Sequence, residues 1–238
     1  MEELIYPNTA DIVMYGYNVC DGCPKTNNIK NVVLSSNTTY IPGCFFGGAR
    51  IENIVIPDSV TYIGYDAFEG CNNLKNITIG NGMQDLDWSD FSECRNLTSV
   101  TIGDGVTKIK SDTFSDCNSL TSITIGNGVT EIEYGALQNC SNLKNVTLGE
   151  GITVIDDGIV SGCTSLEKIT LGKKVTDIGM FAFEDCSSLK SIVIPEGVTN
   201  IGEAIFSGCS DLTSIKVSEK NSKYDSRNNC NAIIETDT

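Results

Sequence analysis

The sequence predicts a β-rich α/β solenoid, an elongated domain wound from similar coils of 23 residues. Two observations lead to this fold class. The first is a ladder of cysteines in which each follows the last by 23 residues: Cys71, Cys94, Cys117, Cys140, Cys163, Cys186 and Cys209. The second is an Ile/Val-x-Ile/Leu triplet that recurs at the same interval and is followed by a turn containing Gly or Pro. A fixed period of about 20 to 50 residues is typical of solenoids and other repeat arrays.

The repeat spans most of the chain. A looser copy of 22 residues, 32–53, comes first and has Ala49 at the cysteine position. The regular copies begin at Ile54, Ile77, Val100, Ile123, Val146, Ile169 and Ile192. We therefore expect one structural domain with an N-terminal cap over 1–31, eight coils over 32–214, and a C-terminal cap or divergent module over 215–238. Atypical ends are expected because the outermost coils must cover the core.

Each coil is expected to contain two short strands. The triplet, as in 77–79, alternates β-branched residues with a period of 2, which predicts a strand with one buried face. A Gly-x-Gly turn follows, and Val-Thr-x-Ile, as in 129–132, predicts a second strand. The remainder, which brings a large apolar residue, a cysteine and a leucine to the core, is expected to be mostly irregular or short helical. The large apolar residues are Phe68, Phe91, Phe114, Leu137, Val160, Phe183 and Phe206.

The complete pattern resembles that of a known repeat family. Gly-x-Gly-Val-Thr-x-Ile, then Phe, then Cys-x-x-Leu-x-x-Ile-x-Ile is similar to the BspA-like class of leucine-rich repeats, and the resemblance covers residues 32–214. Residues 224–236 are similar to a divergent module interspersed among repeats in that family. The resemblance implies a right-handed superhelix with short strands on its concave face. It also implies a non-catalytic binding solenoid, often on the surface of gut and oral bacteria and of some protozoa, that engages host matrix proteins or other cells.

The composition excludes several functional classes. The 238 residues include no histidine, which removes Ser-His-Asp and Cys-His relays and imidazole metal ligands. The 16 basic and 31 acidic residues give a formal net charge of −15, which argues against binding to the phosphate backbone of nucleic acids. No stretch approaches about 18 consecutive apolar residues, so we expect no membrane insertion.

The cysteines are better explained by structure than by chemistry. A metal or redox array would need cysteines grouped at short spacing, usually with histidine. One thiol per coil favours instead a small side chain that fills the turn before a leucine, so we expect reduced thiols, no metal and no other cofactor. Cys20 and Cys23 form a single C-x-x-C motif, which fits a redox pair or a local disulfide in an exported chain.

Other motifs do not indicate an enzyme. The Gly-x-Gly turns match the start of a dinucleotide fingerprint, but the third glycine and the following helix are missing. The carboxylates of Asp85, Asp87 and Asp90, and those of Asp156 and Asp157, could attract Ca²⁺, but they lack the spacing of an EF-hand loop. Nothing selects one carboxylate pair for glycosidase chemistry. We therefore assign no catalytic residue.

The outward-facing residues of the triplets are the first candidate site. The middle residue of each triplet points away from the core, as does the residue two positions earlier. These positions form a nearly uncharged floor of hydroxyls and amides on the side expected to be concave: Thr78, Thr101, Thr124, Thr147, Thr170, Ser99, Ser122 and Asn145. Threonine is also a good strand former, so the floor is either a scaffold or a partner-binding surface.

An aromatic stripe is the second candidate site. Tyr65, Trp88 and Tyr134 share one repeat position with Met180 and with several small or acidic residues. Variable residues at one position indicate a surface site, and exposed Trp and Tyr are favoured as interface anchors. Partial burial under the convex loops is the alternative interpretation.

These observations predict a non-catalytic protein-interaction or adhesion module. It would bind a macromolecular partner, a protein or a glycan, through the concave face. The alternative is a structural spacer or an assembly component of a surface layer or virion, without a dedicated ligand. The family resemblance implies a cell-surface or secreted location. Because the start of the chain has neither a basic nor an apolar signal region, a cytoplasmic or virion-associated location is the other expectation.

Overall fold

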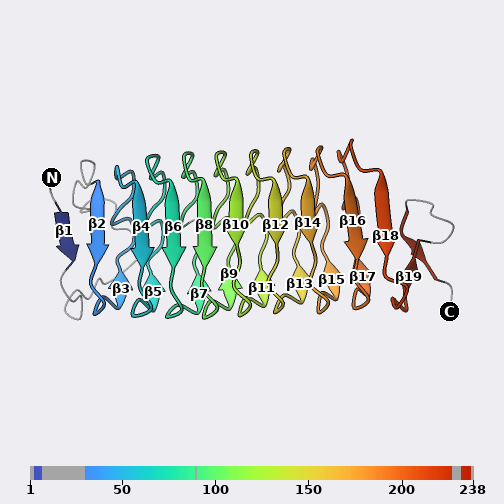
Figure 1. Ribbon diagram of the computed structural model, residues 1–238, viewed down its shortest axis with the longest axis horizontal. Coiled ribbons are helices and arrows are strands. Elements are labelled where there is room, and N and C mark those ends of the chain that lie inside the picture. The colour runs from blue at the N-terminus through green and yellow to red at the C-terminus, as the bar shows by residue number, and fades with distance from the viewer. Residues whose placement is uncertain (1–2, 7–29, 89, 227–231, 237–238) are drawn as a thin grey trace.

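The computed structural model describes residues 3–6, 30–88, 90–226 and 232–236. The chain winds as a parallel β-solenoid whose coils lie side by side along one axis (Figure 1). We number the coils 1 to 8 from their first residues: Val32, Ile54, Ile77, Val100, Ile123, Val146, Ile169 and Ile192. The Cys20–Cys23 motif lies outside the described residues.

The longer strands of successive coils form one parallel sheet, here called the long-strand sheet. Its order along the solenoid is β1 (Glu3–Tyr6), β2 (Asn31–Leu34), β4 (Asn53–Ile56), β6 (Asn76–Ile79), β8 (Ser99–Ile102), β10 (Ser122–Thr124), β12 (Asn145–Thr147) and β14 (Lys168–Thr170). Two further strands pair with each other and continue the row, β16 (Ser191–Ile194) and β18 (Ser214–Val217) (Figure 1).

The two-residue strands form a second parallel row, here called the short-strand sheet. Its members are β3 (Tyr40–Ile41) and β5 (Tyr62–Ile63), which pair with each other, and then β7 (Asp85–Leu86), β9 (Lys108–Ile109), β11 (Glu131–Ile132), β13 (Val154–Ile155), β15 (Asp177–Ile178) and β17 (Asn200–Ile201). Beyond the last coil, β19 (Tyr224–Asp225) and β20 (Ile234–Glu235) form an antiparallel pair. In the described residues no helix is long and apolar enough to cross a membrane.

The 23-residue period sets the strand register. Thr78 lies opposite Thr101 and Ile123 lies opposite Val146, each one coil from its partner. In β6 the residues alternate between exposed and buried, with Ile77 and Ile79 facing the core. Like side chains therefore lie above one another at the strand spacing of about 4.8 Å. The prediction of two short strands per coil, each with one buried face, is confirmed.

The remainder of each coil consists of turns, and the expectation of short helical segments there is wrong. In coil 4 the N–H groups of Asp112, Phe114 and Asp116 donate to carbonyl oxygens of coil 5 over 2.9–3.2 Å. Donors that bond to the next coil are not available for the i−4 bonds of an α-helix. Asp112 and Asp116 also have φ angles of 57° and 58°, and this left-handed backbone is excluded from a right-handed helix.

Two positions of the turn segment have this left-handed backbone in each coil except coil 3, where Glu93 is the described one. At the second position the sequence usually places Gly, Asp or Asn, as at Asp116 and Asn139, which tolerate it. At the first position coil 8 has Ala204, with a φ of 53° and an exposed side chain. Coil 7 has Phe181 there, with a φ of 55°. These two residues keep a conformation that costs an ordinary side chain about 1–2 kcal/mol.

We expect Ala204→Gly to stabilise the protein. Glycine relieves the left-handed strain but loses more backbone entropy on folding, so the expected net gain in the free energy of unfolding is about 0.5–1 kcal/mol. Urea unfolding followed by far-UV circular dichroism measures it. The same substitution at buried Ala182, which lacks a positive φ, should destabilise. Equal losses at both sites would show that Ala204 is unstrained.

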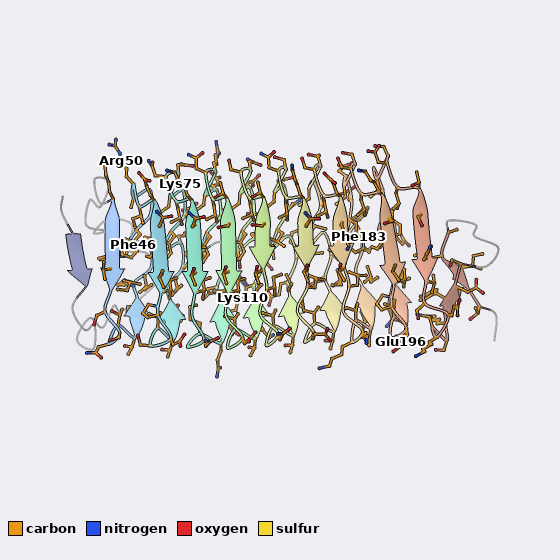
Figure 2. The ribbon with its side chains drawn as sticks, viewed as in Figure 1. Phe46, Arg50, Lys75, Lys110, Phe183 and Glu196 are labelled. Carbon is orange, nitrogen blue, oxygen red and sulfur yellow. The ribbon has the colours of Figure 1, made fainter. Side chains whose placement is uncertain are left out.

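The core is a set of stacked apolar columns between the two sheets and the turn segments. Phe68 and Phe91 stack with ring centroids 5.1 Å apart, and Phe91 and Phe114 with centroids 5.3 Å apart. Figure 2 shows Phe46 and Phe183 within the coils, whereas charged side chains such as Glu196 lie at the rim. Because each coil buries its apolar set only against its neighbours, stability depends on stacking.

The cysteine column makes a specific bond in each of coils 2 to 8. The Sγ atom of Cys117 lies 3.2 Å from the carbonyl oxygen of Phe91 in the preceding coil, and that of Cys140 lies 3.3 Å from the carbonyl oxygen of Phe114. The eight described cysteines are free thiols. Burial raises the pKa of the Cys71 and Cys117 thiols to about 12, so they stay protonated and can donate. The column is structural, as predicted.

Candidate functional site

The residues predicted as a binding floor all lie on the outer face of the long-strand sheet. Seven of them are exposed and one is half-buried: Thr78, Thr101, Thr124, Thr147, Thr170, Ser122 and Asn145 are exposed, and Ser99 is half-buried. The strand register arranges them in two parallel columns, one of threonines and one of serine or asparagine. The prediction that these side chains share one surface is confirmed; their role in binding stays a prediction.

The two columns differ in how their polar groups are used. In the serine and asparagine column, the Asn76 amide donates to the Asn53 side-chain oxygen over 2.7 Å, and the Ser99 hydroxyl donates to the Asn76 oxygen over 2.6 Å. No such bond joins the threonine hydroxyls to other groups within the described residues. The threonine column therefore presents hydroxyl groups that are available to a ligand.

The floor is uncharged from β6 to β12 and changes at both ends. Lys168 is the first charged residue in the serine and asparagine column. The threonine column is flanked by Val55 and Val193, which are both strongly exposed. A polar centre with apolar ends suits a surface that is covered by a macromolecule.

The predicted aromatic stripe is exposed but discontinuous. Trp88 is 57% exposed, and Tyr65 and Tyr134 are similar, so these rings reach the surface. Tyr65 and Trp88 occupy neighbouring coils, whereas Ser111 separates Trp88 from Tyr134.

The sequence argument missed a further aromatic pair. Tyr40 and Tyr62 lie on the short-strand sheet, with parallel rings whose centroids are 5.6 Å apart. Both are outward residues of two-residue strands, a signal that is too short to predict a shared surface.

The outer face of the short-strand sheet carries a charge ladder over coils 3 to 5. Lys110 Nζ lies 3.1 Å from an Asp87 oxygen, and Lys108 Nζ lies 2.6 Å from a Glu131 oxygen. Figure 2 labels Lys110 between the rows of long and short strands. The two lysines of coil 4 thus neutralise carboxylates of the coils on either side.

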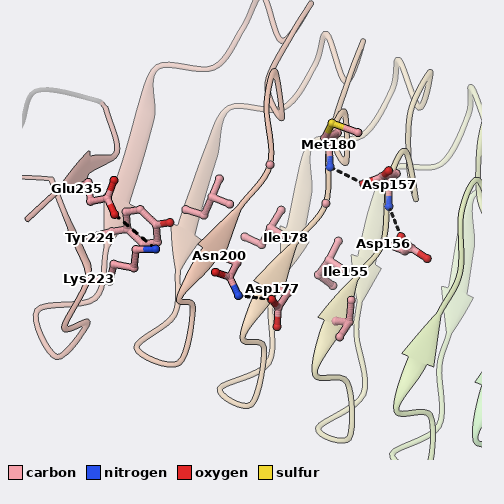
Figure 3. Close-up of a pocket in the computed structure, with 14 residues that line it drawn as sticks. Ile155, Asp156, Asp157, Asp177, Ile178, Met180, Asn200, Lys223, Tyr224 and Glu235 are labelled. Atoms are coloured by element: carbon pink, nitrogen blue, oxygen red, sulfur yellow. Dashed lines mark hydrogen bonds and ion pairs between the residues drawn. The ribbon is translucent and has the colours of Figure 1, made fainter.

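The same face is hollow over coils 6 to 8. A groove of about 500 Å³ opens there (Figure 3), and Gly179 and Gly202 are among the residues that line it. A Cβ atom on Gly202 would lie 2.5 Å from the Met180 backbone nitrogen, so close approach of the coils requires glycine. No sequence prediction named this groove. Its only sequence signal was glycine at the same outward position of two successive coils, Gly179 and Gly202.

The carboxylate clusters do not form a metal centre. Among the described residues, no three Cys, Asp or Glu side chains converge as metal ligands would. Asp90, within coil 3, is instead buried; one of its oxygens accepts the Asp87 N–H over 2.9 Å and the other has no partner within the described residues. Burial raises its pKa well above the usual value. This group bears on stability rather than on a site.

Comparison with known proteins finds matches to repeat proteins. The sequence profile of the BspA type leucine-rich repeat region matches residues 18–144 and 107–234. Among solved structures, a leucine-rich cell surface protein from Faecalibacterium prausnitzii is similar over 84% of this chain, with 33% identity and a TM-score of 0.62. This chain spans only 47% of that protein.

A second solved structure is similar over a comparable length. The leucine-rich repeat protein of T. pallidum covers 76% of this chain, with 26% identity and a TM-score of 0.61, and 77% of its own length is matched. No curated protein matches the chain significantly.

Proposed function

Because the chain belongs to the BspA-type leucine-rich repeat family, we propose that it is a non-catalytic protein-interaction module that acts in adhesion at a cell surface. The long-strand sheet is the proposed binding surface. The observation that carries the proposal is the threonine column, whose hydroxyls face outward on an uncharged floor and are not used by the described part of the fold. The description of the F. prausnitzii protein as a cell surface protein supports the location.

We expect the variant Thr101→Lys, Thr124→Lys, Thr147→Lys to lose partner binding while it keeps the fold. Lysine is tolerated in this column, because Lys216 occupies the equivalent position in β18 opposite Val193. Three ammonium groups at the centre of a flat interface would be desolvated without partners, which should weaken binding about tenfold or more. The partner is captured from matrix and cell-surface extracts with the full chain, and its affinity for both forms is then measured.

A matched control separates the floor from general charge effects. Asn73→Lys, Ser119→Lys, Ser165→Lys adds the same charge on turns that follow the cysteines, where these side chains make no hydrogen bond within the described residues. It should bind as the parent does. Unchanged affinity in the threonine variant would rule out the long-strand sheet as the binding surface. Failure to capture any partner would favour the spacer role.

A further inference from the structure

Coils 3 to 5 show how the outer face of the short-strand sheet satisfies its carboxylates. Lys108 and Lys110 alternate with buried Ile109, so both ammonium groups project from the same face. One pairs with Glu131 in the next coil and the other with Asp87 in the preceding coil. Within the chain, this face therefore pairs a Lys-x-Lys segment with carboxylates of the coils on either side.

Coils 6 to 8 keep the carboxylates but lack the lysines. The strand positions that hold Lys108 and Glu131 hold Val154 and Asp177 two coils later, with the same parallel register. Asp156, Asp157 and Asp177 take part in no ion pair among the described residues. Their hydrogen bonds come from neutral groups, such as the Asn200 amide and the Met180 N–H.

The groove over these coils combines this charge with apolar walls. Four carboxylates and one ammonium line it, which leaves a net formal charge of −3. The ammonium, that of Lys223, lies at one end, 3.4 Å from a Glu235 oxygen and over the Tyr224 ring, so it leaves the aspartates unpaired (Figure 3). Met180 and Val154 are 43% and 37% exposed, although neither makes a large apolar patch.

We propose that this groove binds an extended basic segment of a partner protein, with Lys or Arg at alternate positions. The segment supplies the cations that coil 4 supplies to its own neighbours. Alternate spacing follows because successive side chains of an extended chain point to opposite sides, which places charged side chains toward the aspartates. The site lies on a different sheet from the floor of the proposed function and stands independently of it.

The first experiment uses fluorescein-labelled hexapeptides and the full chain. An alternating Lys-Ala hexapeptide should bind, as measured by fluorescence anisotropy, and its affinity should fall as salt is raised, because exposed ionic contacts are screened. Alternating Glu-Ala and Ser-Ala hexapeptides should not bind. Equal binding of all three peptides, or displacement of the basic peptide by cellohexaose, would overturn the proposal and favour a glycan site.

The second experiment removes negative charge from the groove or adds a positive charge to it. Asp156→Asn, Asp157→Asn, Asp177→Asn keeps the hydrogen-bond acceptors and should weaken binding of the basic peptide about tenfold or more. Val154→Lys places an ammonium opposite Asp177, as Lys108 stands opposite Glu131, and should weaken binding similarly.

The control for charge loss lies elsewhere on the solenoid. Glu93→Asn, Asp116→Asn, Asp185→Asn removes three charges at the left-handed turn position where Asn139 stands naturally, so the fold should persist. This control should bind the basic peptide within about twofold of the parent, since only long-range charge is lost. If it weakens binding as much as the groove variants do, or if the groove variants bind normally, the proposal fails.

Discussion

Phe91→Ala is expected to lower the free energy of unfolding by about 3–5 kcal/mol, the usual cost of truncating a fully buried phenylalanine. The ring is 0% exposed and stacks against Phe68 on one side and Phe114 on the other. Alanine would leave a cavity within a column whose neighbours are fixed by backbone bonds between coils, so collapse around it is limited. Urea unfolding of the full chain, followed by circular dichroism, measures the change.

Phe91→Leu is the informative comparison. Leucine already occupies this position of the repeat in coil 5, as buried Leu137, so this substitution should cost only about 1 kcal/mol. Phe181→Ala removes a phenylalanine that is 41% exposed and should also have a small effect. A loss below about 1 kcal/mol for Phe91→Ala would mean that the coils repack freely, contrary to a stack held in fixed register.

The long-strand sheet could be predicted because its signal repeats. A single Ile-Thr-Ile triplet is ambiguous, but seven triplets at one interval constrain each other, because a shift by one residue would expose every buried isoleucine. The outward direction of Thr101 and Thr124 follows directly from that alternation. The position of each cysteine in the core followed in the same way.

The turn segments could not be predicted with the same success. Their backbone is set by bonds to the next coil, such as that from the Phe114 N–H to the Ala136 oxygen, and propensity within one coil does not report them. Phe181 and Ala204 even occupy left-handed positions that their residue types disfavour. The groove was missed for a related reason, since Gly179 and Gly202 line it together with residues of other coils, and the pattern within one coil does not report it.

The second large effect concerns the buried carboxyl group of Asp90. The equivalent positions of coils 2 and 5 hold Ala67 and Ala136, which are apolar and buried, and that of coil 4 holds buried Thr113. Burial, together with the charges of Asp87 and Asp66, raises the Asp90 pKa, although the bond from the Asp87 N–H opposes this. The positive charge of Lys110 acts to lower the Asp90 pKa. An acid with a raised pKa in the folded state destabilises that state when its proton must be released.

We expect Asp90→Asn to stabilise the protein at pH 7 by about 1–3 kcal/mol. Asparagine keeps an acceptor for the Asp87 N–H and removes the ionisable group. Below the unfolded-state pKa of 3.8, most of the parent carries the proton in both states, so the advantage should nearly vanish there. It should grow as the pH rises and level off above the folded-state pKa. Urea unfolding of both proteins from pH 3.5 to 8 measures this profile.

Asp90→Ala distinguishes burial of charge from loss of a hydrogen bond. This substitution removes both the unpaired oxygen and the acceptor for the Asp87 N–H. It should therefore stabilise the protein less than Asp90→Asn only if the hydrogen bond from Asp87 contributes to the stability of the folded state. A gain that is independent of pH in both variants would assign the effect to packing. If both variants are less stable than the parent at pH 7, the carboxylate is compensated in the folded chain and the expectation is wrong.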